Sequence, residues 1–180
     1  MDYFEKQIDS KLMYTGRIVK LYSDTVELCS GRTAGREVVE HPGGVGIVPI
    51  DESGNVVAVR QFRYPVGDEL LEIPAGKLEY GEDPYECAVR ELSEETGYTA
   101  GEMVFLGMFY PSPGYCREKL YIYLALDLKA GDMHLDEDEY LNVERVPLDD
   151  FVRMIMDCEN HDAKTIIGVL KAQKYLQAHR

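Results

Sequence analysis

Three glutamates stand close together on one predicted helix. Glu91, Glu94 and Glu95 are spaced i, i+3 and i+4 in the segment 83–96. A helix turns by about 100° per residue, so their side chains share one stripe, where like charges repel. Carboxylate oxygens are also the ligands that Mg²⁺ prefers. The stripe therefore indicates either a solvent-facing acidic surface or a seat for divalent cations, and the spacing alone does not separate the two.

Local signals define the ends of this helix. Asp83 suits the N-cap, Pro84 suits the first helical position, and Glu86 stands three residues after the cap, as in a capping box. Gly97 suits the position after the last helical residue. The residues that recur at helical spacing between these ends should pack against the core: Tyr85, Ala88, Val89, Leu92 and Thr96.

The rest of the chain predicts many strands and few helices. Alternation over 11–40 predicts a β-meander with Gly31 and Gly35 at a turn, and 44–50 with 55–64 predict a hairpin closed by the turn 51–55. Further elements follow in chain order: extended segments at 69–76, 103–110, 119–126 and 141–146, and helices at 148–157 and 162–177. Strands and helices do not alternate strictly, so we expect an α+β fold, a mixed sheet covered by helices.

The composition indicates a folded acidic chain. Its 180 residues are 45% hydrophobic and 29% charged, which argues against disorder. A net charge of −14 repels a phosphate backbone, so we expect no nucleic-acid partner. No apolar stretch is long enough for a bilayer and the N-terminus lacks a secretory pattern, so we expect a cytoplasmic protein without a membrane partner. The four cysteines and four histidines show no zinc-ligand spacing.

A longer motif surrounds the acidic helix. Residues 76–98 read GKLEYGEDPYECAVRELSEETGY and match G-x5-E-x7-R-E-U-x-E-E-x-G-U, where U is a bulky apolar residue. Tyr98 takes the last apolar place, where an aliphatic residue is more usual. This segment resembles the Nudix box. The resemblance implies a Nudix hydrolase, an α/β/α sandwich with a mixed β-sheet that splits a nucleoside diphosphate linked to another group, with Mg²⁺ or Mn²⁺ as its cofactor.

The resemblance assigns roles within the motif by position. The implied metal site has Glu91 and Glu95 as main ligands, Glu94 beside them, the carbonyl of Ala75, and Glu82 through a water molecule. Arg90 is expected to orient the glutamates. Because we expect the stripe to be exposed, Glu95→Gln should abolish most activity without unfolding the protein.

The acidic segment 134–140 supplies candidates for a general base. In relatives a glutamate of this loop positions the attacking water, and the match favours Glu137. Glu139 is then a second candidate or an additional metal contact. The alternative is a disordered acidic turn without a role in catalysis.

A second signal concerns the substrate. Pro113 lies sixteen residues after Gly97, inside YPSPGYCRE, and this resembles the ADP-ribose pyrophosphatase subgroup over roughly 45–170. The resemblance implies four substrate-binding residues: Arg63 at the diphosphate, Glu118 at the terminal ribose, Pro113, and Glu72 of EIPAG. A guanidinium suits bidentate phosphate contact. The alternatives are a surface ion pair for Arg63 and a loop-surface charge for Glu118.

These observations predict metal-dependent hydrolysis of ADP-ribose to AMP and ribose 5-phosphate. The alternatives are hydrolysis of another nucleotide sugar, hydrolysis of a coenzyme such as NADH or FAD, and a non-catalytic ADP-ribose sensor on the same fold. Residues 1–42 are expected to form a β-strand region for dimerisation and adenine-side contacts, and residues 43–180 the hydrolase domain. Strands with open edges need cover, and we expect a homodimer.

Overall fold

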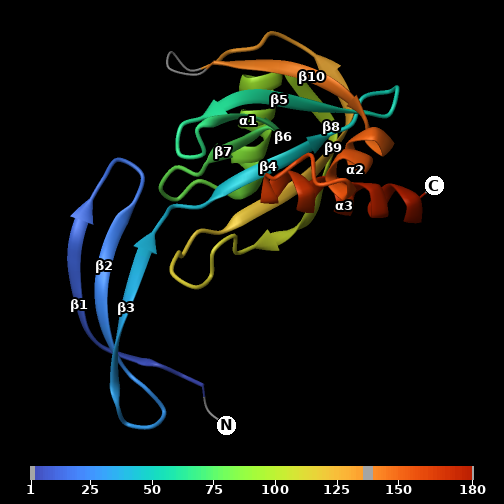
Figure 1. Ribbon diagram of the computed structural model, residues 1–180. Helices are drawn as coiled ribbons and strands as arrows, with labels where there is room; N and C mark the ends of the chain where they lie inside the picture. Colours follow the sequence, from blue (N-terminus) through green and yellow to red (C-terminus); the bar gives the residue numbers. More distant parts are fainter. Residues whose placement is uncertain (1–2, 136–139, 180) are drawn as a thin grey trace. The chain divides into compact units, whose positions relative to one another are not determined.

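A computed structural model describes residues 3–135 and 140–179. The chain divides into two compact units, one formed by Met1–Gly43 with Tyr110–Lys119 and the other by Gly44–Phe109 with Leu120–Arg180. Figure 1 labels their helices and strands. No helix in the described ranges is both long enough and apolar enough to cross a membrane.

The first unit contains the expected β-meander. Its antiparallel strands are β1 (Lys6–Thr15), β2 (Lys20–Glu27) and β3 (Thr33–Glu40). Gly31, with a φ of 78°, lies in the turn between β2 and β3, as predicted. The prediction was wrong for Gly35, which pairs with Thr25 inside β3. The segment Tyr110–Lys119 joins this unit through two backbone hydrogen bonds at Val39, whose amide donates to the carbonyl of Tyr115 and whose carbonyl accepts from the amide of Arg117.

The second unit carries two sheets and the helices. Its elements in chain order are β4 (Gly44–Pro49), β5 (Asn55–Arg63), β6 (Asp68–Glu72), β7 (Ala75–Lys77), α1 (Pro84–Thr96), β8 (Tyr98–Phe109), β9 (Leu120–Ala130), β10 (Leu141–Pro147), α2 (Leu148–Met156) and α3 (Ala163–Ala178). One sheet has the strand order β7-β4-β9-β8 and the other β10-β5-β6. Because β4 is parallel to β9 and antiparallel to β7, the first sheet is mixed, as expected.

Strand β4 is the centre of a three-layer arrangement. All six of its residues are buried, which a strand needs when both of its faces are covered. Val45 and Ile47 pack into one cluster with α1, and Val48 packs into another with α3. Side chains alternate between the faces of a strand, so the sheet lies between α1 and α3. Figure 1 shows this α/β/α layering of the second unit.

The predicted hairpin between β4 and β5 is wrong. The two strands belong to different sheets, and Ile50 and Val56 form an isolated bridge beside them. The turn itself is where it was expected, since Asp51 Oδ1 accepts hydrogen bonds of 2.9 Å from the amides of Ser53 and Asn55. After the turn, β5 pairs with β6 and β10, because the edges of β4 are already used by β7 and β9.

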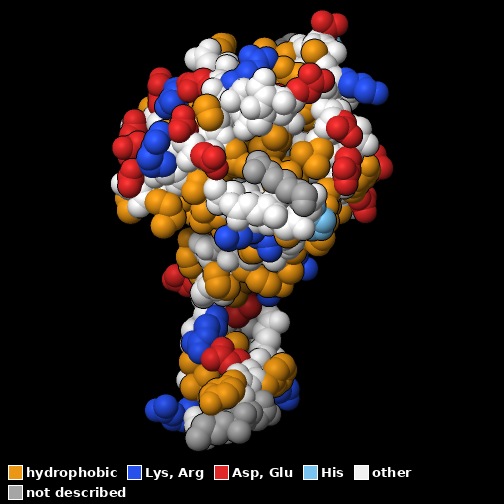
Figure 2. Space-filling view, turned by 90° about the vertical axis from the view of Figure 1, so that its right-hand side faces the viewer, with side chains coloured by type: hydrophobic (Ala, Val, Ile, Leu, Met, Phe, Trp, Pro, Cys, Tyr) orange, Lys and Arg blue, Asp and Glu red, His pale blue; other side chains and the backbone are white. Residues whose placement is uncertain are grey.

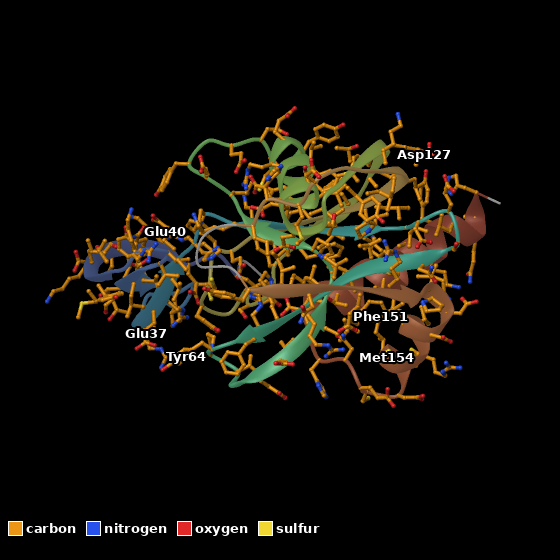
Figure 3. The ribbon with its side chains drawn as sticks, turned by 90° about the horizontal axis from the view of Figure 1, so that it is seen from above. Glu37, Glu40, Tyr64, Asp127, Phe151 and Met154 are labelled. Carbon is orange, nitrogen blue, oxygen red and sulfur yellow. The ribbon has the colours of Figure 1, made fainter. Side chains whose placement is uncertain are left out.

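Helices α2 and α3 cover the core on the side away from α1. Phe151 of α2 is fully buried, and Met154 packs at the margin of the same cluster (Figure 3). A Cβ on Gly168 would lie 2.9 Å from Val48 Cγ2, so a glycine lets α3 approach β4 closely. On the face shown in Figure 2, acidic side chains lie along both sides of the second unit with Lys and Arg among them.

Candidate active site

Helix α1 begins and ends where the local signals place it. The side chain of Asp83 accepts a hydrogen bond of 2.8 Å from the amide of Tyr85, and Pro84 is the first helical residue. Gly97 ends the helix with a φ of 71°. A Cβ on Gly97 would also lie 3.1 Å from the carbonyl oxygen of Gly131. Glycine is therefore required there for the left-handed conformation and for the close passage of the chain.

The three glutamates of the stripe differ in burial. The side chain of Glu94 is 37% exposed, that of Glu91 is 12% exposed, and Glu95 is fully buried. The expectation of an exposed stripe is wrong for Glu95, because α1 packs against β7 and the Glu95 carboxylate is bonded to the backbone of that strand. A carboxylate in such a place must be compensated by hydrogen bonds or charges. A purely solvent-facing acidic surface is therefore a poor description of this helix face.

Strand β7 shapes the space around two of these carboxylates. The amide of Ala75 donates a hydrogen bond of 3.0 Å to Glu95 Oε2. A Cβ on Gly76 would lie 1.8 Å from Glu91 Cδ, so the first glycine of the motif makes room for the Glu91 carboxylate. Strand β7 and the acidic face of α1 thus meet at the backbone of residues 75 and 76.

Arg90 joins the remaining acidic residues of the motif. Its Nη1 lies 2.8 Å from Glu91 Oε1 and 2.8 Å from Glu94 Oε2. Its Nε and Nη2 lie 3.1 and 3.3 Å from the two carboxylate oxygens of Glu82. Glu82 Oε2 also accepts a hydrogen bond of 2.8 Å from the amide of Glu79. The arginine that was expected to orient the glutamates contacts three of them.

The electrostatics of this cluster follow from these contacts. Burial alone would lower the pKa of Arg90, but its hydrogen bond to Glu82 and the charge of Glu91 outweigh burial and raise it. The hydrogen bond from Arg90 lowers the pKa of Glu82. Burial raises the pKa of the neighbouring Cys87 thiol to about 12. The carboxylate of Glu82 is therefore held in its ionised form and the thiol of Cys87 in its neutral form.

The donor set fits a hard divalent cation in its chemistry. Glu82, Glu91, Glu94 and Glu95 offer only oxygen atoms, which Mg²⁺ and Mn²⁺ bind. Within residues 3–135 and 140–179, no group of three or more Asp, Glu, His or Cys side chains is arranged so that it could hold a metal ion. The position of Arg90 explains this arrangement, because the carboxylates of Glu82, Glu91 and Glu94 form ion pairs with its guanidinium.

Arg63 and Glu72 form a second charged group in the same unit. Arg63 Nε and Nη2 donate hydrogen bonds of 2.8 and 2.7 Å to the two carboxylate oxygens of Glu72. Glu72 is fully buried, whereas the Arg63 side chain is 37% exposed. Lys164 of α3 also contacts Glu72, and sequence reasoning did not find it. Its place in the sequence, two residues after the helix cap Asp162, does not predict a contact with Glu72.

The start of the acidic segment 134–140 and the residues just before it are hydrogen-bonded to the end of α1. The amide of Gly131 donates a hydrogen bond of 2.7 Å to the carbonyl of Gly97, and the amide of His134 donates one of 3.1 Å to the carbonyl of Glu94. The two candidates for the general base, Glu137 and Glu139, lie outside the described residues.

Tyr98, the departure from the usual motif, has a polar contact. Its hydroxyl accepts a hydrogen bond of 2.6 Å from Arg145 Nη2 of β10. An aliphatic residue cannot accept this bond, so the tyrosine links the end of the motif to the strand that follows the acidic loop.

The other two substrate-binding candidates belong to the first unit. Glu118 Oε1 lies 3.7 Å from His41 Nδ1. Pro113 lines a cavity of about 620 Å³ in that unit, together with Glu40, His41, Pro42, Tyr110, Cys116, Arg117 and Lys119.

The fold and the motif define a known class of protein. Residues 40–167 match the model of the NUDIX domain, which covers more than half of the chain. The chain therefore belongs to the NUDIX family, and the expected family is confirmed. A solved structure described as an ADP compounds hydrolase has the same fold, with a TM-score of 0.87 over 99% of this chain and 98% of its own, at 24% identity.

Curated relatives match nearly the whole chain. An ADP-ribose pyrophosphatase of Bacillus subtilis (strain 168) is 40% identical over 98% of this chain and 97% of its own length. A methanol dehydrogenase activator of Bacillus methanolicus is 43% identical over 96% and 92%. An ADP-ribose pyrophosphatase of Mycobacterium tuberculosis (strain ATCC 25618 / H37Rv) is 36% identical over 91% and 80%.

Proposed function

We propose that this protein hydrolyses ADP-ribose to AMP and ribose 5-phosphate. The observation that carries the proposal is the 40% identity to an ADP-ribose pyrophosphatase over 98% of the chain. A water oxygen attacks one phosphorus, the bridging P–O bond of the diphosphate breaks, and each product leaves with a terminal phosphate. The loop with Pro113 and the intact acidic motif support the same assignment.

The divalent cation of this proposal binds at the motif. Glu91 and Glu95 would hold it, with Glu94 beside them, and the Ala75 carbonyl and Glu82 would support it, Glu82 through a water molecule. When bound, Mg²⁺ or Mn²⁺ offsets the charge of the diphosphate and lowers the pKa of a bound water. Arg90 holds Glu82, Glu91 and Glu94 close together by charge. Without that compensation three neighbouring carboxylates would repel each other.

The remaining roles concern the substrate and the proton. Arg63 contacts the diphosphate, Glu118 accepts hydrogen bonds from the terminal ribose, and Pro113 shapes the loop beside it. A glutamate of the acidic loop, Glu137 or Glu139, accepts the proton of the attacking water. The attachment of residues 131 and 134 to the end of α1 supports this last role, because it brings the start of that loop to the helix that carries the metal ligands.

A substrate panel tests the proposal. Purified protein with Mg²⁺ is offered ADP-ribose, GDP-mannose, NADH, FAD and a nucleoside triphosphate, and the products are separated by chromatography. We expect the highest kcat/KM for ADP-ribose, and no turnover after chelation until Mg²⁺ or Mn²⁺ is restored. Preference for the triphosphate would contradict the proposal. No turnover of any compound, together with tight binding of ADP-ribose, would identify a sensor instead.

A second candidate function is hydrolysis of another nucleoside diphosphate derivative. GDP-mannose pyrophosphatases of Yersinia are 35% identical over 77% of this chain and 74% of their own length. The panel includes NADH and FAD because hydrolysis of a coenzyme is one of the alternatives left open by the sequence. A kcat/KM for GDP-mannose or NADH above that for ADP-ribose would favour this candidate.

We also propose a homodimer that uses the first unit. All ten residues of β1 are exposed, and β1 is an edge strand of its sheet. Ile8, Leu12 and Tyr14 on this strand are between 49% and 60% exposed, and Figure 2 shows hydrophobic side chains at the surface of this sheet. A second copy would cover both the edge and the apolar side chains. Light scattering after size exclusion tests this, and a species of 20.4 kDa would contradict it.

A further inference from the structure

Lys164 lies in a group of charges that the motif does not include. Its side chain is 12% exposed and stands in the first turn of α3. Its Nζ contacts Glu72 Oε2 and lies 3.0 Å from Asp162 Oδ2. A lysine this well covered, between two carboxylates, has lost most of its conformational freedom. Its charge is therefore held at one place.

Glu72 is held from two sides. Arg63 binds both of its oxygens, and Lys164 contacts one of them as well. Burial by itself would raise the pKa of Glu72, but the hydrogen bonds from Arg63 and the charge of Lys164 outweigh it and lower the pKa. Because Glu72 is fully buried and both its oxygens are engaged, it is better placed to hold Arg63 than to touch a substrate.

Hydrogen bonds connect the end of β6 with the residues around the start of α3. Asn160 Nδ2 donates a hydrogen bond of 2.6 Å to the carbonyl of Leu71, and the amide of Ile73 donates one of 2.9 Å to Thr165 Oγ1. Both chain neighbours of Glu72 are thus bonded to residues near Lys164 in the sequence, one before it and one after it. Asp162 caps α3 by accepting from the amide of Thr165 at 3.0 Å. The start of α3 and the end of β6 are therefore joined by hydrogen bonds into one piece.

This piece continues into the active site. Three residues after Glu72, the amide of Ala75 is bonded to Glu95, which we propose as a metal ligand. The charge of Glu95 also contributes to the raised pKa of Arg63, after the larger effect of the hydrogen bond to Glu72. Arg63 uses Nε and Nη2 on Glu72, and among the described residues no acceptor is bonded to Nη1.

We propose that Lys164 is a positioning residue of the hydrolase site: it holds Glu72 from the side of α3, and Glu72 holds the guanidinium of Arg63 so that Nη1 can bind the substrate diphosphate. This inference rests on the proposed function only in requiring a diphosphate substrate. A guanidinium held by a rigid partner binds phosphate at a lower entropic cost than one that must be ordered on binding.

A double-mutant cycle tests the proposal. Lys164→Met, Arg63→Met and the double variant are compared with the wild type, and Lys174→Met serves as the control because Lys174 is an exposed lysine of the same helix that contacts Gln177. We expect Lys164→Met to lower kcat/KM about ten-fold, mainly through KM. In the Arg63→Met background the same change should have no further effect, because the lysine acts through the arginine. Lys174→Met should match the wild type.

Binding gives a readout besides turnover. The affinity for the best substrate of the panel without divalent ion, measured by calorimetry, should fall for Lys164→Met and not for Lys174→Met. The proposal would be overturned if the loss of kcat/KM in the double variant equalled the product of the two single losses. An unchanged KM and affinity for Lys164→Met would also overturn it. If Lys164→Met does not fold, Lys164→Arg replaces it in the same cycle, since it keeps the charge but changes the geometry of the contact. Kinetics use the best substrate of the panel, so an incorrect ADP-ribose assignment leaves this test intact.

Discussion

The amide of His134 donates a hydrogen bond of 3.1 Å to the carbonyl oxygen of Glu94. This bond joins the residue that opens the acidic loop to a glutamate of the Nudix motif. The bond between Gly131 and the carbonyl of Gly97 adds a second attachment at the same helix end. The loop with the two candidates for the general base therefore begins beside α1, although His134 stands 40 positions after Glu94 in the sequence.

Glu95→Gln is predicted to remove most of the activity. The amide side chain still accepts a hydrogen bond from Ala75 but carries no charge for the cation, so we expect kcat to fall about 100-fold or more. Turnover is measured at saturating Mg²⁺, and metal uptake is measured by calorimetry. Thermal unfolding serves as the control for the fold, since Glu95 is buried. Wild-type turnover would show that Glu95 is not a ligand.

Gly76→Ala is predicted to damage the site more than the fold. The added Cβ meets the carboxylate of Glu91, which is the end of a flexible side chain and can be displaced. We expect an activity loss of about ten-fold or more with a small change in Tm. Gly35→Ala is the matched control, because nothing lies within 4 Å of a Cβ at that position. Equal activity of the two variants would refute the role given to Gly76.

Cys87 is predicted to be the least reactive thiol of the folded protein. Burial raises its pKa to about 12, so almost no thiolate is present at neutral pH. Cys29 and Cys158 are exposed and should react first with a thiol reagent. Absorbance during the reaction should show two fast thiols, and all four should react in denaturant. Rapid modification of Cys87 in the double variant Cys29→Ser, Cys158→Ser would contradict the burial of this side chain.

Glu72→Gln is predicted to destabilise the protein in a pH-dependent way. The pKa of Glu72 is lowered in the folded state, so its contribution to stability is present above its ordinary pKa and is lost as the pH falls through the lowered value. At pH 7 we expect a loss of about 2–3 kcal/mol, because Arg63 and Lys164 keep their charges without a counter-charge. Denaturant unfolding as a function of pH measures this. The difference from the wild type should shrink below about pH 4, and a constant difference would contradict the assignment.

Tyr64 is an aromatic residue exposed at the surface of the second unit. It is 88% exposed in the turn between β5 and β6, directly after Arg63, and Figure 3 shows its position at the edge of the second unit. Its aromatic ring was not distinguishable from the other tyrosines by sequence, because a surface position has no pattern of its own.

Local features of this protein followed from the sequence alone. Helix α1 spans Pro84–Thr96 as its cap, its proline and its final glycine predicted, because these signals act within a few residues of the chain. The family was indicated by the resemblance of residues 76–98 to the Nudix box, a motif that is also local. The strands of the meander and the two C-terminal helices were predicted for the same reason, with Gly35 as the exception.

Only the tertiary structure decided which of these residues act together. The pairing of β4 with β9 instead of β5, the burial of Glu95, and the contacts of Glu72 with Arg63 and Lys164 join segments that are distant along the chain. Residue type and spacing do not predict such partners, because they describe only neighbours along the chain. Burial and the pairing of charges arise when the layers pack, and only this packing brings Lys164 to Glu72.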